Sequence, residues 1–221
     1  MIAFIFVRKN STRLKNKNLR LINGKPLFYH SIKIAKKIKE IKDIYVSTDS
    51  ERIIKLSKKY GVGVIKRPRN LTKTDSIEYL SWKHAVYELE KRNIKFKKFI
   101  SIPSTAPLRN EKDIYKCIKK LKDNNQIVVT AYESPTDPRE IKISKSKEGI
   151  YFMEKKEIKK TIKLNKVYNL TTIAYVTTTD YIKKNNKLFD GKVSVVKIPK
   201  IRAIDINDEN DFKIAKSLMK K

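Results

Sequence analysis

The chain has 221 residues, of which 40% are hydrophobic, which is enough to build the core of one large domain and excludes a disordered chain. Its 53 Lys and Arg residues exceed its 23 Asp and Glu residues, and a net charge of +30 would ordinarily indicate a nucleic-acid partner. The excess is spread along the whole chain instead of being gathered beside stacking aromatic residues, so we expect no nucleic-acid partner.

An uninterrupted apolar run opens the chain at residues 2–7. Such a run predicts a short strand that is buried on both faces of a parallel sheet. It stops too early to be the apolar core of a signal peptide or a membrane span. The single cysteine, Cys117, falls in a predicted helix and has no second cysteine with which to form a disulfide. We therefore expect a cytoplasmic protein with no membrane attachment.

Strands and helices alternate along most of the remaining chain. The pattern predicts further strands at residues 43–47, 62–66, 96–102, 126–131, 171–177 and 193–198. It predicts helices at residues 26–39, 50–61, 75–92, 110–122 and 208–219. This alternation predicts an α/β fold with a mostly parallel sheet and helices on both of its faces.

Residues 134–168 break the alternation. This segment is polar and rich in Lys, and two prolines and one glycine interrupt it, so we expect an insertion that leaves the sheet. Candidate strands at 140–144 and 150–153 would pair as a hairpin. Because no linker or internal repeat is evident, we expect residues 1–221 to form a single domain that carries this insertion.

The loop after the first strand is strongly cationic. Six basic side chains occur within thirteen residues, namely Arg8, Lys9, Arg13, Lys15, Lys17 and Arg20. Ligands bind open α/β sheets at the carboxyl ends of the strands, and cationic side chains there hold polyphosphate well. The loop therefore predicts a phosphate site, although a solvated basic loop in a generally basic chain would have the same composition.

Three later loops also follow predicted strands, at residues 67–74, 103–109 and 205–211. The last of them is acidic. A basic loop and an acidic turn at one edge of a sheet indicate a nucleotide site with Mg²⁺, which prefers one or two carboxylates plus phosphate oxygens. Taken singly, these loops have ordinary explanations as a turn or as the acidic cap of a helix.

Five short motifs follow one another along the chain. They are Arg8, Ser11 and Lys17-Asn18 before Gly24-Lys25-Pro26-Leu27; Val46-Ser47-Thr48-Asp49; Arg67-Pro68 with Leu71; Thr105-Ala106-Pro107-Leu108-Arg109; and Asp205-Ile206-Asn207. In this order the chain resembles the CMP-sugar synthetases, the cytidylyltransferases that activate sialic (acylneuraminate), legionaminic and pseudaminic acids. The resemblance runs from residue 2 to about 218 and implies a Rossmann-like nucleotide-diphospho-sugar transferase fold.

The resemblance also implies a reaction. CMP is transferred from CTP to the anomeric hydroxyl of a 2-keto acidic sugar, pyrophosphate leaves, and the product serves surface glycan biosynthesis. The implied cofactor is Mg²⁺, held by Asp205 and Asn207. Arg8 and Lys17 would hold the triphosphate and, with Asp205, form the catalytic set.

The remaining roles implied by the resemblance concern the nucleoside and the sugar. The nucleotide-binding set is completed by Ser11, Asn18, Arg67 and Ser76, of which Arg67 and the backbone near Ser76 would read the cytosine edge. The implied substrate-binding residues are Pro103, Ser104, Thr105, Tyr168 and Asn169. The insertion at 134–168 corresponds to an arm that completes the partner's sugar pocket, which implies a homodimer.

Several positions depart from the family pattern. Lys9-Asn10 replaces a double glycine, Asn207 replaces a second metal-binding aspartate, and Asn169 or Tyr168 stands where an arginine for the sugar carboxylate is expected. We therefore expect weaker metal affinity, and we keep two alternatives open. One is a nucleotidyltransferase for another acceptor, such as 3-deoxy-manno-octulosonate, and the other is a non-catalytic relative that binds nucleotide.

Overall fold

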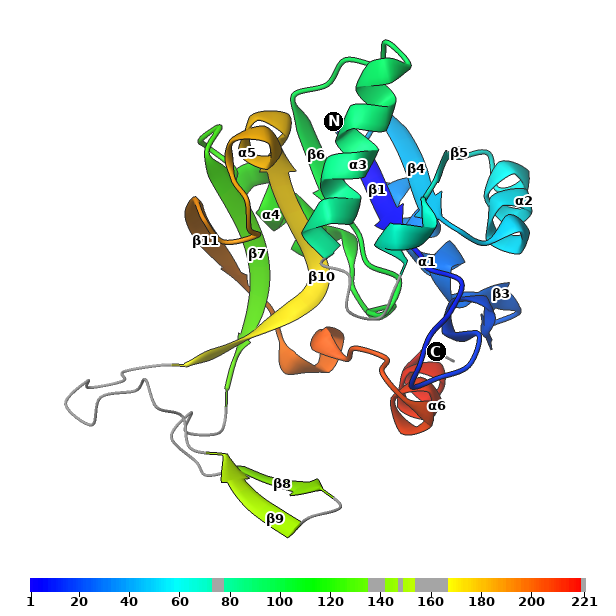
Figure 1. Ribbon diagram of the computed structural model, residues 1–221, viewed down its shortest axis with the longest axis vertical. Helices are drawn as coiled ribbons and strands as arrows, with labels where there is room; N and C mark the ends of the chain where they lie inside the picture. The colour runs from blue at the N-terminus through cyan, green and yellow to red at the C-terminus, as the bar shows by residue number, and fades with distance from the viewer. Residues whose placement is uncertain (73–77, 135–141, 147–148, 154–166, 220–221) are drawn as a thin grey trace, which may run out of the picture.

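The computed structural model describes residues 1–72, 78–134, 142–146, 149–153 and 167–219, with the backbone alone for 142–146 and 149–153. Its main element is a seven-stranded sheet in the order β11-β7-β10-β6-β1-β4-β5 (Figure 1). The strands are β1 (Ile2–Phe6), β4 (Asp43–Thr48), β5 (Gly63–Lys66), β6 (Lys98–Ser101), β7 (Gln126–Glu133), β10 (Tyr168–Thr178) and β11 (Lys192–Lys197). Only β10 runs antiparallel to its neighbours, so the predicted mostly parallel sheet is confirmed.

Strand β1 lies in the interior of the sheet, between β4 and β6. Its side chains alternate between the two faces, as the pleat requires. Ala3 and Ile5 belong to one buried apolar cluster, whereas Ile2 and Phe4 belong to the cluster on the opposite face. The unbroken apolar run at the start of the chain is therefore explained by burial on both faces.

Helices cover both faces of the sheet, as predicted. The cluster on one face contains side chains of α1 (Leu27–Ala35), α2 (Glu51–Lys59) and α4 (Glu111–Lys120). The cluster on the other face contains side chains of α3 (Glu78–Lys91) and α5 (Thr179–Lys184) (Figure 1). On that face the Trp82 indole stacks on the Phe6 ring with 6.0 Å between ring centroids, which fixes α3 over the end of β1.

Side-chain caps set the starts of three helices where the sequence predicts them. Ser50 Oγ accepts a hydrogen bond from Ile53 N at the start of α2. Asn110 and Asp208 each form a reciprocal capping box at the starts of α4 and of α6 (Glu209–Leu218). The predicted helix at 26–39 is shorter at both ends: α1 starts at Leu27, because Pro26 pairs with Leu21 in the small sheet of β2 (Leu21–Ile22) and β3 (Lys25–Pro26), and it ends at Ala35.

The insertion lies between β7 and β10. Tyr168 pairs with Glu133, and the Ser134 N–H donates to Val167 O at 2.8 Å, so the chain leaves the sheet and returns at one point. Strands β8 (Lys142–Ser146) and β9 (Gly149–Met153) pair antiparallel in a sheet of their own, which confirms the predicted hairpin. Strand β10 starts earlier than expected, and α5 after it was not predicted.

A third apolar cluster joins the two ends of the chain. It contains Leu14 from the basic loop, Ile22 and Leu27 from the segment that follows, and Ile206, Phe212 and Ala215 from the C-terminal region. Arg20 also pairs with Glu209 at 2.5 Å. These contacts hold α6 beside the loop that follows β1. In the described part of the chain, no helix has the length and apolar character needed to cross a membrane.

Candidate functional site

A pocket of about 330 Å³ lies at the carboxyl ends of the parallel strands. Its lining comes from β1 and the following loop, from the segments after β5 and β6, and from α3 and β10. The lining residues are Phe6, Arg8, Ser11, Arg13, Lys17, Asn18, Arg67, Leu71, Glu78, Ser81, Pro103, Ser104, Thr105 and Thr172. This is the edge at which open α/β sheets bind ligands.

Hydrogen bonds fix the basic loop on the sheet. The Lys9 N–H donates to Asp49 Oδ1 at 2.7 Å, so the aspartate at the end of β4 holds the start of the loop. Asn18 Nδ2 donates to Arg8 O at 3.2 Å, and Asn18 Oδ1 accepts from Ser104 Oγ at 2.7 Å. Asn18 therefore ties the loop to the segment after β6. Both the nitrogen and the oxygen of its side-chain amide form hydrogen bonds within the protein.

Lys17 joins the basic loop to the acidic turn. It belongs to the short 3-10 helix η1 (Lys17–Leu19), and its Nζ donates to Ile206 O at 2.7 Å. Burial lowers the pKa of Lys17, and the positive charges of Arg13 and Arg8 lower it further, whereas Asp205 raises it. A cation from the first loop and a carboxylate from the last turn thus lie at one edge of the sheet.

A short chain of hydroxyl groups connects the pocket to Asp205. Thr105 Oγ1 donates to Thr172 Oγ1 at 3.4 Å, and Thr172 Oγ1 donates to Asp205 Oδ1 at 2.8 Å. Asp205 itself lines an adjoining groove of about 340 Å³, which it shares with Thr172, Leu170 and Asp211. Thr172 lines both cavities, so it stands between the cationic pocket and the carboxylate.

The oxygen ligands around Asp205 fit Mg²⁺ that is bound jointly with phosphate. Asn207 Nδ2 donates to Asp205 Oδ2 at 3.0 Å, which places the amide and the carboxylate side by side. Asp211 is the next carboxylate, but it accepts from the Asn207 and Asp208 N–H groups as part of the α6 cap. Among the described residues no cluster of three or more metal-binding side chains occurs. A cation held by one carboxylate and one amide oxygen would take its other ligands from phosphate and water.

Arg67 is buried at the side of the pocket nearest β5, with 7% of its surface exposed. Its Nη2 donates to Ser47 O at 2.9 Å and its Nε to Ser47 Oγ at 3.3 Å. The guanidinium lies 5.7 Å from the centroid of the Phe6 ring. Burial lowers the pKa of Arg67 to about 10, so it stays charged at neutral pH. Two of its five N–H donors are used in these bonds, which leaves others for a ligand.

Arg109 positions the segment that follows β6. It is buried, and it donates to Ser31 Oγ at 2.8 Å, to Thr172 O at 3.2 Å and to Pro103 O. Burial lowers the pKa of Arg109 to about 9, while Asp205 and Asp113 raise it. Arg109, which ends the fourth motif, therefore does not line the pocket. It holds in place the segments that do.

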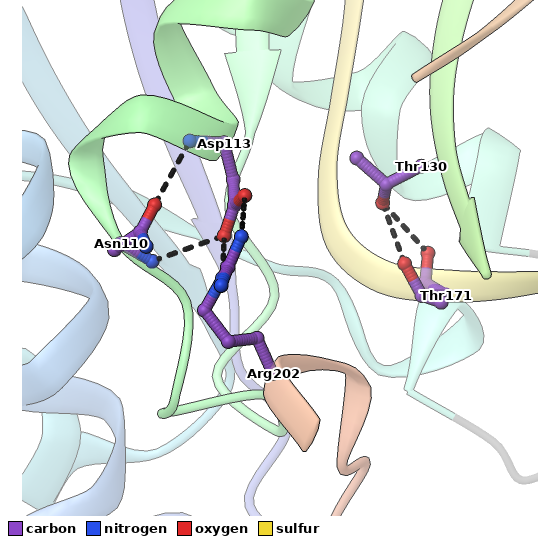
Figure 2. A network of polar contacts seen from close by, with 5 residues as sticks. All are labelled: Asn110, Asp113, Thr130, Thr171 and Arg202. Carbon is purple, nitrogen blue, oxygen red and sulfur yellow. Dashed lines mark hydrogen bonds and ion pairs between the residues drawn. The ribbon is translucent and has the colours of Figure 1, made fainter. Parts of the chain in front are cut away.

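A second clamp holds the turn that carries Asp205 (Figure 2). Arg202, in the 3-10 helix η3 (Lys200–Ala203), donates from Nε and Nη2 to the two carboxylate oxygens of Asp113, each at 2.8 Å. This hydrogen bond raises the pKa of Arg202. The hydroxyl groups of Thr130 and Thr171 lie 2.6 Å apart beside it, on β7 and β10. The Arg202–Asp113 pair thus fastens η3, which precedes the acidic turn, to the start of α4, and the two threonines join β7 to β10.

Most of the residues singled out from the sequence lie at this edge. Arg8, Ser11, Lys17, Asn18, Arg67, Pro103, Ser104 and Thr105 line the pocket, and Asp205 and Asn207 adjoin it. Tyr168 and Asn169 are not among the lining residues. Lys197 Nζ lies 4.5 Å from the Tyr168 ring centroid, and Asn169 Nδ2 donates to Ser134 Oγ at 3.1 Å, both where the insertion meets the sheet. Ser76 lies outside the described residues.

The sequence analysis missed several lining residues. They are Phe6, Glu78, Ser81 and Thr172, whereas Arg13 belongs to the predicted basic loop and Leu71 to the third motif. Thr172 lies inside the predicted strand at 171–177, but the register of β10 shifts between Thr171 and Tyr175, which no local sequence pattern shows. Glu78 sits in the first turn of a helix, where an acid is common, so its sequence position alone gives no signal.

Comparison with known proteins adds three findings. The family model described as cytidylyltransferase matches residues 2–194. The chain is 29% identical over 230 residues to post-translational flagellin modification protein B of Campylobacter coli, with 100% of this chain and 95% of that protein covered. It is also 29% identical over 229 residues to CMP-N,N'-diacetyllegionaminic acid synthase of Campylobacter jejuni, with 99% and 94% covered.

Solved structures support the same fold. CMP:2-keto-3-deoxy-manno-octonic acid synthetase, solved with CTP, superposes with a TM-score of 0.70 at 14% identity, covering 99% of this chain and 97% of that one. A 4-diphosphocytidyl-2C-methyl-D-erythritol synthase of Anaerococcus prevotii gives a TM-score of 0.65 at 16% identity, with 100% and 99% covered. The predicted Rossmann-like nucleotide-diphospho-sugar transferase fold is confirmed.

Proposed function

The chain belongs to the cytidylyltransferase family, and on that premise we propose that it transfers CMP from CTP to the anomeric hydroxyl of a 2-keto acidic sugar, with release of pyrophosphate. The relatives named for legionaminic and pseudaminic acids, and the N-acylneuraminate cytidylyltransferase of Escherichia coli at 24% identity, support this class of acceptor. The product would be an activated sugar for surface glycan biosynthesis.

One observation carries the proposal. Lys17 Nζ lies 2.7 Å from the carbonyl oxygen of Ile206, the residue next to Asp205, although the two segments are far apart in the sequence. Cationic and anionic groups that a nucleotide triphosphate with its metal requires therefore lie on the same edge of the sheet. A basic loop whose only role was to be solvated would not need a lysine beside the acidic turn.

The chemistry needs charge neutralisation and alignment more than covalent help. Arg8, Arg13 and Lys17 supply positive charge along the loop, where they would hold the triphosphate and favour departure of pyrophosphate. Ser11 would add a hydrogen bond to phosphate, and Asn18 would keep the loop in register with Ser104. The sugar hydroxyl attacks the α-phosphorus, so its oxygen forms the new bond to phosphorus as the bond to pyrophosphate breaks.

Mg²⁺ is the proposed cofactor, with Asp205 and Asn207 as its protein ligands. When bound, it neutralises charge on the phosphate oxygens. Thr172 orients the Asp205 carboxylate through the bond to Oδ1, and Asn207 does so through Oδ2. Asn207 in place of a second carboxylate reduces the negative charge of the site, and we therefore propose that the affinity for the metal is low in the absence of nucleotide.

The acceptor sugar would occupy the side of the pocket nearest β10. Pro103, Ser104 and Thr105 line the pocket there, and Thr172 opens onto the adjoining groove beside Asp205. We propose a cytoplasmic homodimer in which the insertion at 134–168 reaches the partner's sugar site. Tyr168 and Asn169 lie at the base of that insertion, from which they would contact the sugar only in the assembled dimer.

The test is release of pyrophosphate. We expect release from CTP in the presence of Mg²⁺ and a sialic, legionaminic or pseudaminic acid, and little release from ATP, GTP or UTP. Activity with 3-deoxy-manno-octulosonate in place of the nine-carbon acids would establish the alternative acceptor. Binding of CTP without release in any of these mixtures would favour a non-catalytic nucleotide-binding protein and contradict the proposal.

A further inference from the structure

The helices on the two faces of the sheet differ in charge. Helices α1, α2 and α4, on one face, contain nine basic and three acidic residues, whereas α3 and α5, on the other face, contain four of each within the ranges that the structure describes. A general bias of the sequence toward lysine would not favour one face. All nine basic side chains are exposed, and we call this set the basic face: Lys33, Arg52, Lys55, Lys58, Lys59, Lys112, Lys116, Lys119 and Lys120.

The basic face has no acidic partner of its own. Each of the three acids on α1, α2 and α4 pairs with a cation from outside the set: Glu51 with Lys66, Glu111 with Lys37, and the third with Arg202. Among the described residues, none of the nine basic side chains forms an ion pair. On the other face, two acids of α3 pair with lysines of α3 and α5. The positive charges of the basic face therefore repel one another and attract an external anion.

The three helices of this face form one continuous layer. Lys37, just after α1, reaches Glu111 at the start of α4 at 2.8 Å, and Lys36 Nζ donates to Tyr60 O at the end of α2 at 2.6 Å. Helix α4 packs on β7, β10 and β11, and α2 packs on β4 and β5, so the layer extends across the sheet. In the described part of the chain, none of the large apolar side chains that are exposed belongs to these helices. The basic face is therefore broad and charged, with no apolar patch.

We propose that the basic face binds to the surface of a bilayer that contains anionic phospholipids. Each lysine close to such a surface adds to the attraction, and a layer of three helices presents several lysines at once. Eight of the nine basic residues are lysines, whose compact charge attracts phosphate without a fixed geometry. Nucleic-acid surfaces rely more on arginine and on stacking aromatic residues. The exposed aromatic residues Tyr87 and Phe189 lie on α3 and beyond α5, away from the basic face.

Contact through the basic face leaves the nucleotide pocket accessible. None of the described residues that line this pocket belongs to α1, α2 or α4. A bilayer against these helices would therefore not cover the pocket, and the attraction does not depend on the proposed reaction. The lack of a long apolar run led to the expectation of no membrane attachment, but attraction between a charged face and lipid headgroups needs no such run.

The test is co-sedimentation of the full-length protein with vesicles of about one quarter phosphatidylglycerol and the rest phosphatidylcholine. We expect binding at about 0.15 M salt, release at about 1 M salt, where the Debye length is about 3 Å, and no binding to phosphatidylcholine alone. A face variant with three substitutions on α2 and three on α4 should bind at least about tenfold more weakly, because glutamine removes the charge and keeps the helix propensity. Its substitutions are Arg52→Gln, Lys55→Gln, Lys59→Gln, Lys112→Gln, Lys116→Gln and Lys120→Gln.

The matched control removes the same number of positive charges from exposed lysines outside α1, α2 and α4. It should bind the anionic vesicles as the parent does, because the basic face is intact. Both variants should keep the melting temperature and the rate of pyrophosphate release of the parent, since no lining residue of the pocket is changed. The control substitutions are Lys95→Gln, Lys97→Gln, Lys98→Gln, Lys184→Gln, Lys187→Gln and Lys192→Gln.

Three results would each overturn the proposal. The parent protein might stay in the supernatant with the anionic vesicles at about 0.15 M salt. Equal loss of binding in both variants would show that the overall charge is responsible and not the basic face. Displacement of the parent from the vesicles by single-stranded RNA, at an equal concentration of phosphate groups, would assign the face to nucleic acid. If the face variant melts earlier than the parent, the substitutions on α2 and on α4 are measured separately, and each set should weaken binding at least about threefold.

Discussion

At the scale of the residue, the site depends on two charged side chains, Asp205 and Lys17. Asp205 is one carboxylate, with one oxygen bonded to Thr172 and the other to Asn207. Lys17 lies beside it, with a pKa lowered by burial. Burying charge costs free energy, and hydrogen bonds within the fold, from Lys17 to Ile206 O and to Asp205 from Thr172 and Asn207, offset part of that cost.

Asp205→Asn removes the negative charge and keeps the volume. We expect kcat to fall about 10²- to 10³-fold, because the charge that would hold the metal is lost, while the melting temperature stays close to that of the parent. Pyrophosphate release and thermal unfolding measure the two quantities. Asp180→Asn, in the first turn of α5 and not among the lining residues of either cavity, is the control and should change neither. Turnover of CTP at the parent rate by Asp205→Asn would show that the metal assignment is wrong.

Asn207→Asp restores a second carboxylate. It replaces the hydrogen bond of 3.0 Å to Asp205 Oδ2 by the repulsion of two like charges. We expect the melting temperature to fall in EDTA and to recover in Mg²⁺, and the Mg²⁺ concentration at half-maximal turnover to fall about tenfold. A variant whose stability is indifferent to Mg²⁺ would argue against a cation between these two side chains.

At the scale of the element, the short helix η3 controls where Asp205 lies. Arg202 in η3 donates two hydrogen bonds to Asp113, whose side chain is 1% exposed. The clamp joins η3, just before the turn that carries Asp205, to the start of α4. Helix α4 packs on the face of the sheet opposite α3. The Arg202–Asp113 pair would therefore affect the reaction only by fixing the position of Asp205.

Arg202→Ala leaves Asp113 without its charged partner. We expect the free energy of unfolding to fall by about 1–3 kcal/mol, and kcat to fall as the turn loosens, with little change in the affinity for CTP. Urea unfolding and pyrophosphate release give the two values. Lys66→Ala is the control, because its ion pair with Glu51 is exposed on both sides and should contribute no more than about 0.5 kcal/mol. Equal unfolding curves for Arg202→Ala and the parent would contradict the clamp.

The elements were largely predictable from the sequence, and the exceptions have physical causes. Apolar runs predicted the core strands, and local patterns predicted helix starts near residues 50, 110 and 208, where the structure has side-chain caps. Helix α5 is only six residues long, too short for a helical period to show. The small sheet at Pro26 and the early start of β10 depend on pairing with distant strands, which no local pattern encodes.

The site was predictable in part. The residues found from the sequence are those that carry unusual charge in loops after strands, such as Lys17 and Asp205. Those missed belong to regular elements, such as Thr172 on β10 and Glu78 on α3, where an ordinary structural explanation was sufficient. The tertiary fold brings these residues together: α6 packs against the loop after β1, and the sheet and α3 place Thr172 and Glu78 on the pocket wall.

At the scale of the whole molecule, the proposed role of the insertion is to form the homodimer. Ser134 N–H and Val167 O are 2.8 Å apart, so the neck of the insertion is narrow enough for a tight turn to replace it. Replacing residues 135–166 by Asn-Gly should therefore leave the seven-stranded sheet intact, with a melting temperature within about 5 °C of the parent.

The shortened chain should be a monomer and should bind CTP without turning it over. Analytical ultracentrifugation of parent and shortened chain at equal concentration measures the first expectation, and nucleotide titration the second. A parent protein that sediments as a monomer, or a shortened chain that remains a dimer, would refute the assignment of the insertion as a dimerisation arm.

The central claim is that the cationic loop and the acidic turn share one nucleotide. The most direct measurement is a crystal structure of the protein with CTP and Mg²⁺. Our account predicts the triphosphate along Arg8 and Lys17, the cytosine beside Arg67, and the cation between the phosphates and Asp205. A nucleotide bound elsewhere, or one whose phosphates point away from Asp205, would contradict it.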